Sequence, residues 1–320
     1  MPRIRWARVG LATAPWLFIA AAYVLLPDYL PLGAQIMIMI LFALSLDLIV
    51  GYAGLVSLGH AAFFGVGAYA AGLLARHTAA DPLIGLAVGA LAGAVLGLAS
   101  GALVLRTRGL TFLMLTLSVV FVLHEIANRA VFLTGGDDGL QGMTVPPILG
   151  LWRFDMFGRT AYVYTALVLL ACWLALVHLV DSPFGRSLVG IRENEIRMRS
   201  LGAPVFRRVL AAYTVSAALA GIAGALSAQT TQFVALKSIS FSLSAEILIM
   251  LILGGVGRLY GAFLGPAVYM VAQDAFAKGD PVFWSFWIGV VLIVVVLAGR
   301  NGVIGVIEDI ARRLRKADHP

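Results

Sequence analysis

Long apolar runs that follow one another with little charge between them are the feature that most constrains this chain. A transmembrane helix needs about 20 mainly apolar residues. Charged residues make up only 12% of the sequence and hydrophobic residues 61%, whereas soluble domains have about 25% charged residues. The sequence therefore predicts an all-α fold, a polytopic membrane bundle of about ten transmembrane helices. They are expected near residues 10–27, 32–52, 55–75, 83–105, 110–126, 161–180, 206–230, 243–256, 260–276 and 283–299.

The positions of the basic residues predict the orientation of this bundle. Arginine and lysine are enriched in cytoplasmic loops, and ten spans put all the basic segments on one side, with both termini in the cytoplasm. These segments are the N-terminal arginines, Arg106 with Arg108, residues 181–208 and the tail 301–320. The tail has the spacing of an amphipathic surface helix. Bases gathered in short segments do not form the continuous basic face that nucleic-acid binding needs. Residues 1–320 are expected to form a single transmembrane domain.

Residues 181–208 form the most highly charged internal segment, between two apolar runs. Ser182 is a helix cap followed by Pro183 at the first helical position, and Gly202 followed by a proline is a stop signal. Glu193 with Arg197 and Glu195 with Arg199 have i, i+4 spacing. The segment is predicted to be a pair of short cytoplasmic helices. Its apolar residues give it a face for the membrane surface or a protein partner.

Rows of small residues at four-residue spacing predict close helix packing. The row in the fourth span runs from Gly85 to Gly101, and similar rows start at Ser216 and at Gly257. Small residues let helix backbones approach closely in lipid. Two glycine-rich segments also match at an offset of 200 residues, with identical residues at Gly54, Ala62, Phe63, Gly65 and Tyr69 and at Gly254, Ala262, Phe263, Gly265 and Tyr269. Transporters often carry such repeats near the substrate path.

The sequence offers no sign of catalytic chemistry. No glycine is followed by lysine in a phosphate-binding loop, and the histidines and the lone cysteine lack metal-ligand spacing. Cys172 is expected to be a small core residue. Charged residues inside a span usually face a cavity or a partner. His60 and Glu246 lie deepest in the expected spans, whereas Asp47 lies near the end of one and is expected to reach the interface.

Several stretches carry a resemblance to a known family. They are GYAGLVSLGHAAFFGVGAY at 51–69, RGLTFLMLTL at 108–117, TGGDDGL at 134–140, SPFGRSLVGIRENEIRMRSLGA at 182–203 and LGGVGRLYGAFLGP at 253–266. In this order they resemble the inner-membrane permeases of branched-chain amino acid ABC importers, over residues 40 to 275. The chain is most similar to the second of the two permease types of that system. Asp47 departs from the pattern, which has asparagine there.

The resemblance implies a non-catalytic transport subunit in a multi-pass inner-membrane complex. The implied partners are a second homologous permease, two cytoplasmic ATPases that bind ATP and magnesium, and a periplasmic amino-acid-binding protein; no cofactor is implied for this chain. Segment 181–208 would be the coupling segment that docks on the ATPase. The residues on the coupling motif are Gly185, Arg186, Arg192, Glu193, Glu195 and Gly202. The residues expected along the translocation path are Ser57, Gly59, His60, Gly65 and Tyr69. Glu246 is added to this set because it is a polar residue inside an expected span.

Three alternatives remain. Urea and amide importers share the same permease architecture, so the resemblance leaves the substrate open. An ion-coupled secondary transporter would use Glu246, Asp47 or His60 as its ion site. A scaffolding subunit would need no path at all.

Overall fold

The computed structural model describes residues 15–279 apart from 79–80, 149, 151 and 156, together with residues 283, 286–287 and 289–290. Every regular element in the part described is helical, which confirms the all-α prediction. After an apolar helix over Pro15–Leu25, the elements are η1 (Pro27–Tyr29), α2 (Leu30–Asp47), η2 (Leu48–Tyr52), α3 (His60–Thr78), α4 (Pro82–Val104), α5 (Gly109–Arg129), α6 (Val131–Thr134), η3 (Gly136–Asp138), α7 (Arg159–Asp181), α8 (Pro183–Glu193), α9 (Glu195–Ser200), α10 (Val205–Thr231), η4 (Leu236–Ile239), α11 (Phe241–Gly254) and α12 (Gly261–Gly279).

Five helical stretches among the described residues are long and apolar enough to cross a membrane. They are Pro27–Tyr52, α4, α5, α7 and α10. The helix over Pro15–Leu25 and α11 are apolar but shorter, and α3 and α12 occupy two more of the predicted ranges. The predicted span 283–299 lies mostly outside the described residues, and so do the N-terminal arginines and the tail 301–320.

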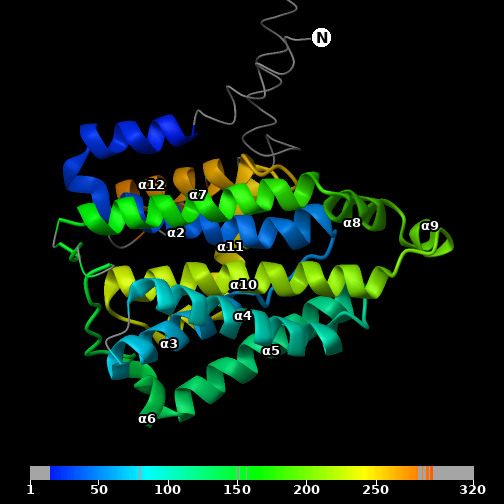
Figure 1. Ribbon diagram of the computed structural model, residues 1–320, viewed down its shortest axis with the longest axis horizontal. Helices are drawn as coiled ribbons and strands as arrows, with labels where there is room; N and C mark the ends of the chain where they lie inside the picture. Colours follow the sequence, from blue (N-terminus) through cyan, green and yellow to red (C-terminus); the bar gives the residue numbers. More distant parts are fainter. Residues whose placement is uncertain are drawn as a thin grey trace, which may run out of the picture.

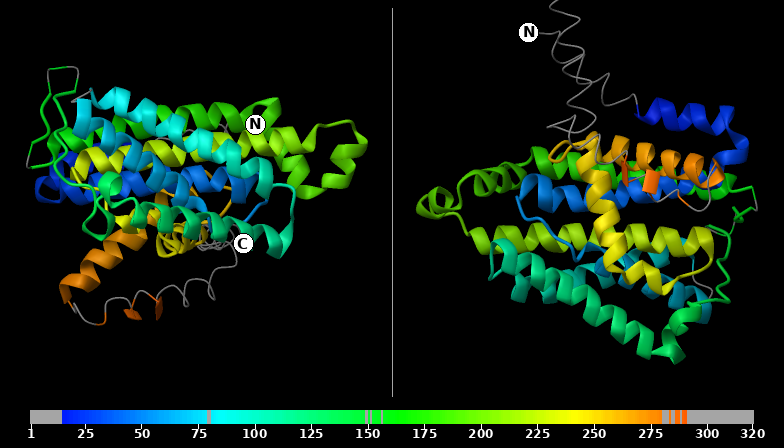
Figure 2. Two further views of the ribbon diagram at one scale, coloured as in Figure 1. Left: turned by 90° about the horizontal axis from the view of Figure 1, so that it is seen from below. Right: turned by 180° about the vertical axis from the view of Figure 1, so that it is seen from behind.

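Helix α10 lies at the centre of the bundle, between α2 on one side and α3 and α4 on the other (Figure 1). Helices α7 and α12 cover the outer face of α2, while α11 crosses the other helices at a steep angle (Figure 2). Helices α8 and α9 project beyond one end of the bundle, and the loop that follows η3 lies at the opposite end (Figure 1). The charged segment 181–208, which contains α8 and α9, therefore extends from one end of the bundle.

The glycine row of α4 packs against α10, as its spacing predicts. A Cβ atom at Gly93 would overlap the carbonyl oxygen of Ala217, and one at Gly89 would lie 2.7 Å from the Cβ of Ala225. The row on α10 that begins at Ser216 faces α3 instead, because a Cβ at Gly224 would overlap the carbonyl oxygen of Phe64. Two adjacent rows of small residues thus let α10 approach two helices at backbone distance.

The predicted span 55–75 is wrong at its start, because α3 begins only at His60. Helix α2 ends in the π-helical turn η2, and Gly54 then adopts a φ of +74°, which turns the chain out of the helix. Residues 53–59 are non-helical, and the N–H of Leu55 donates back to the carbonyl oxygen of Ile49 at 3.0 Å. Non-helical backbone at membrane depth must be enclosed by protein or line a cavity. Here Ala53, Leu55, Ser57 and Gly59 are buried.

The second of the two matching segments shares this arrangement. Helix α11 ends at Gly254, Gly255 has a φ of +106°, and α12 begins after a short turn. Both α3 and α12 have 19 residues, and the matching residues Ala62, Phe63, Ala262 and Phe263 are buried. The offset of 200 residues therefore relates two places where a glycine-rich turn with positive φ precedes a helix of 19 residues.

Candidate functional site

Helix α8 begins and ends as its sequence predicts. The hydroxyl of Ser182 accepts a hydrogen bond from the backbone N–H of Gly185 at 3.4 Å, and Pro183 occupies the first helical position. Leu188 and Ile191 are buried on one face, through which α8 packs against α7, α10 and η2. Burial of this stripe fixes α8 on the end of the bundle.

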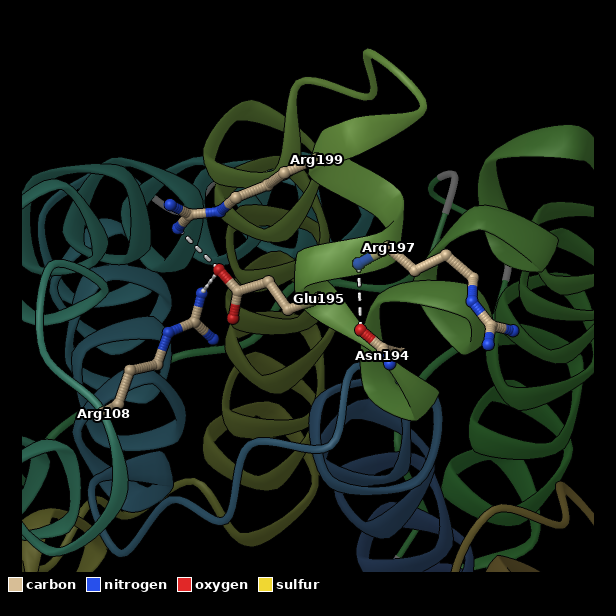
Figure 3. Close-up of polar contacts among 5 residues, drawn as sticks. All are labelled: Arg108, Asn194, Glu195, Arg197 and Arg199. Carbon is tan, nitrogen blue, oxygen red and sulfur yellow. Dashed lines mark hydrogen bonds and ion pairs between the residues drawn. The ribbon is translucent and has the colours of Figure 1, made fainter.

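Helix α9 is separated from α8 by Asn194, which confirms the predicted pair of short helices and places the break that the sequence did not locate. Asn194 has extended backbone, and its side-chain oxygen accepts a hydrogen bond from the N–H of Arg197 at 2.9 Å (Figure 3). Gly202, at a φ of +79°, ends the segment as predicted. Because the break puts Glu193 and Arg197 on different helices, the ion pair expected between them does not form in the described structure.

Glu195 ties α9 to the turn between α4 and α5. Its Oε1 atom accepts hydrogen bonds from Arg108 and from Arg199, each at 2.6 Å (Figure 3). The i, i+4 pair with Arg199 was predicted from the spacing, whereas the pair with Arg108, 87 residues away, was not. The Glu195 side chain is 25% exposed. It is the least exposed of the three side chains. Its two hydrogen bonds help to orient α9.

The tip of the segment exposes apolar and basic side chains together. Ile196 is 79% exposed and Leu201 74%. Arg197 and Arg199 flank Ile196 on the same short helix and are also exposed. An exposed apolar residue with a basic rim fits an apolar groove with an acidic rim on a protein partner.

The remaining residues of the predicted coupling set have different roles. Gly185 is buried, and a Cβ there would overlap the carbonyl of Val180, so this glycine permits the tight turn between α7 and α8. Arg186 and Glu193 are exposed. Arg192 reaches back to the bundle, where its Nη1 donates to the carbonyl oxygen of Gly51.

His60, the first residue of α3, is fully buried among polar contacts that join α3 to α2, α10 and α11. Its Nε2 lies 2.9 Å from the hydroxyl of Ser45 on α2 and 3.5 Å from that of Ser216 on α10. The ring stacks on Phe42 with centroids 5.5 Å apart, and the N–H of Ala61 donates to the hydroxyl of Ser244 on α11. The serine partners were missed by the sequence analysis; their only signal was a hydroxyl within an apolar helix.

The other residues predicted along the path are mostly interior. The Ser57 hydroxyl accepts from the N–H of Gly59, and both residues are buried. Gly65 faces η4, where a Cβ would overlap Ile239. Tyr69 is 6% exposed. Glu246 is half-buried on α11 and interacts with the Tyr269 hydroxyl on α12. In this conformation the Gly-His segment is therefore a packing centre inside the subunit, and its place along a path stays a prediction.

Asp47 lies in the core, so the prediction that it reaches the membrane interface is wrong. It is fully buried, and its Oδ1 accepts a hydrogen bond from the N–H of Gly257 at 2.7 Å. Gly257 belongs to the turn between α11 and α12, 210 residues further along the chain. Sequence spacing carries no signal for such a distant contact.

The family is decided by comparison with known proteins. A family model described as the permease component of the branched-chain amino acid transport system matches residues 30–296. The chain belongs to this family of branched-chain amino acid transport permeases. Membership confirms the resemblance inferred from the sequence motifs. Together with the apolar helices, it makes the chain a multi-pass protein of the inner membrane.

Two permeases called LivM are similar to about three quarters of the chain. The high-affinity branched-chain amino acid transport system permease LivM of Salmonella typhimurium is 32% identical over 269 residues, 76% of this chain and 62% of the relative. LivM of Escherichia coli is 31% identical, over 74% of this chain and 61% of the relative. The match thus spans about three fifths of their length.

More distant permeases also match. The autoinducer 2 import system permease LsrC of Klebsiella pneumoniae is 29% identical, over 67% of this chain and 61% of the relative. No solved structure matches significantly.

Proposed function

We propose that the chain is the membrane-spanning permease subunit of an ABC importer that carries branched-chain or related amino acids inward. The match of the family model over residues 30–296 carries this proposal, and the names of the LivM relatives give its substrate class. The chain is a transport subunit and not the catalyst. ATP and magnesium bind to its partners.

The proposed topology has ten spans with both termini in the cytoplasm, and residues 1–320 form one permease domain. Helices α8 and α9 then lie on the cytoplasmic side, as does the turn that holds Arg108. The projection of this pair of helices from one end of the bundle supports the assignment (Figure 1).

The proposed complex contains a second homologous permease, two ATPases and an extracytoplasmic amino-acid-binding protein. Helix α9 docks on the ATPase, with Ile196 and Leu201 as apolar anchors and Arg197 and Arg199 at the rim. Their exposure supports this role, since apolar anchors surrounded by polar residues dominate binding energy at interfaces. Glu195 supports the docking helix through Arg108.

Reconstitution tests the proposal. The chain would be purified from native membranes with its accompanying subunits, placed in liposomes and supplied with labelled leucine and its binding protein. Uptake that requires ATP hydrolysis, and that ignores proton and sodium gradients, is expected. Uptake that follows an ion gradient without ATP would overturn the proposal in favour of a secondary transporter.

The substrate class needs its own measurement. In the same liposomes, unlabelled leucine, isoleucine and valine are expected to compete with labelled leucine, whereas urea and acetamide are not. Competition by the amides alone would assign the chain to an amide importer.

A further inference from the structure

Arg192 leaves α8 toward the bundle along a path lined by glycines. Gly54 lies beside its aliphatic stem, where a Cβ atom would be 2.7 Å from Cγ of Arg192. At the end of the path, Nη1 of Arg192 donates to the carbonyl of Gly51. A Cβ at Gly257 would lie 3.2 Å from the same nitrogen. Side chains at these positions would compete with the guanidinium for space, so the glycines leave room for this arginine.

Asp47 brings a third element to the same place. Its Oδ1 accepts from the N–H of Gly257, so the turn between α11 and α12 is held against the end of α2. Gly51 lies between the two contacts, because a Cβ there would overlap Oδ1 of Asp47 and would lie 2.7 Å from Cα of Gly257. Asp47, Gly51, Arg192 and Gly257 therefore form one contact group, here named the Arg192 latch.

The charges of this group favour the arginine. The last carbonyl groups of a helix lack partners within the helix and carry the negative end of its dipole. Gly51 belongs to the final turn of the helix formed by α2 and η2, so its carbonyl oxygen is one of these terminal acceptors. Arg192 supplies the cation at this end from a different helix. Charge-assisted hydrogen bonds of this kind are stronger than neutral ones.

We propose that Arg192 is a positioning residue that passes movement of the coupling segment to two membrane elements, the end of α2 and the turn between α11 and α12. The proposal rests on the proposed function. Arg192 is on the same segment as the proposed docking residues, yet its guanidinium contacts the bundle. Arg197 and Arg199 lie on the projecting helix α9 (Figure 3). The contacted carbonyl lies in the π-helical turn η2, which ends at Tyr52, and π-helical turns are often found at functional sites.

The test compares Arg192→Gln, Arg192→Lys and Arg129→Gln in the complete importer. ATP hydrolysis and leucine uptake are measured in the same liposomes, and copurification of the ATPase is measured beforehand. For Arg192→Gln, uptake per ATP hydrolysed is expected to fall about tenfold, the effect of losing one charge-assisted hydrogen bond, while the ATPase still copurifies. Lysine keeps a charged donor and is expected to restore most of the ratio. Arg129, an exposed arginine paired with Glu125 on α5, is the control and should leave it unchanged.

Two results would overturn the proposal that Arg192 transmits movement of the coupling segment. Loss of the ATPase from the Arg192→Gln complex would show that Arg192 is a docking residue, and an unchanged ratio would show that it transmits nothing. The wild-type complex separates these failures from failure of the proposed function. If wild-type liposomes show no ATP-driven uptake, the function is wrong whatever the variants do.

Discussion

Arg108, at the start of α5, donates to the carboxylate of Glu195 on α9 at 2.6 Å, although 87 residues separate them. This contact joins the two charged turns at one end of the bundle (Figure 3). It links α9 to the segment between α4 and α5.

A reversed pair tests the contact between Arg108 and Glu195. The single changes Arg108→Glu and Glu195→Arg place like charges together and are expected to weaken ATPase copurification, while the double variant restores it. Because the Arg108 side chain is 44% exposed, the stability term is small, about 0.5 kcal/mol. Copurification is therefore the measurement of choice. A double variant as weak as either single one would show that each charge acts separately.

The contact between α4 and α10 predicts a strong effect at Gly93. A larger side chain there meets the backbone of Ala217 and must push the helices apart. Gly93→Leu is expected to cost about 3 kcal/mol or more of stability, seen as loss of folded permease from detergent-solubilised membranes. Ala99→Leu on the exposed face of α4 is the matched control and should fold normally. Normal folding of both variants would refute the close packing.

The buried histidine predicts separate effects on stability and transport. His60→Ala removes the contacts with Ser45 and Phe42 and leaves a cavity, at an expected cost of about 2–4 kcal/mol. His77→Ala, at the exposed other end of α3, is the control. Thermal unfolding in detergent measures this cost. Transport is then compared at equal amounts of folded protein, and a further loss there would support a role of His60 along the path.

Local signals predicted the elements, but contacts between distant segments required the structure. Ser182, Pro183 and Gly202 act within a few residues and correctly marked the start of α8 and the end of α9. The glycine rows likewise predicted which face of α4 packs. The direction of the Arg192 side chain and the burial of Asp47 depend on Gly51 and Gly257, which meet only when α2, α8 and α11 assemble. Helical periodicity contains no information about such partners.

The same reasoning explains the wrong start of the predicted span 55–75. Its apolar composition fits a helix, but Gly54 takes a left-handed φ and Ser57 bonds to the local backbone. Both preferences compete with helix formation. The sequence GHAA thus marks where α3 begins and not the interior of a span.

Two substitutions of Asp47 show whether its hydrogen bond to Gly257 or its negative charge is required. Asp47→Asn keeps an oxygen acceptor for the Gly257 N–H, so we expect this variant to fold and to transport. Asp47→Leu removes the acceptor and leaves the half-buried N–H of Gly257 without its partner, at a cost of about 1 kcal/mol. The measurements are thermal unfolding in detergent and uptake in liposomes. A failing Asp47→Asn variant would mean that the negative charge itself is required.

The exposed side chain of Ile196 on α9 is expected to contribute to binding of the ATPase. Ile196 is 79% exposed in the isolated chain, and burying an isoleucine in a partner's groove stabilises a complex by about 1.5–3 kcal/mol. Ile196→Ser is therefore expected to weaken binding of the ATPase about tenfold or more, measured by titrating purified ATPase onto the permease in detergent. Ile196→Leu keeps the apolar surface and serves as the control. Equal affinity of both variants would move the docking surface away from α9, to the exposed face of α8 that carries Arg186 and Glu193.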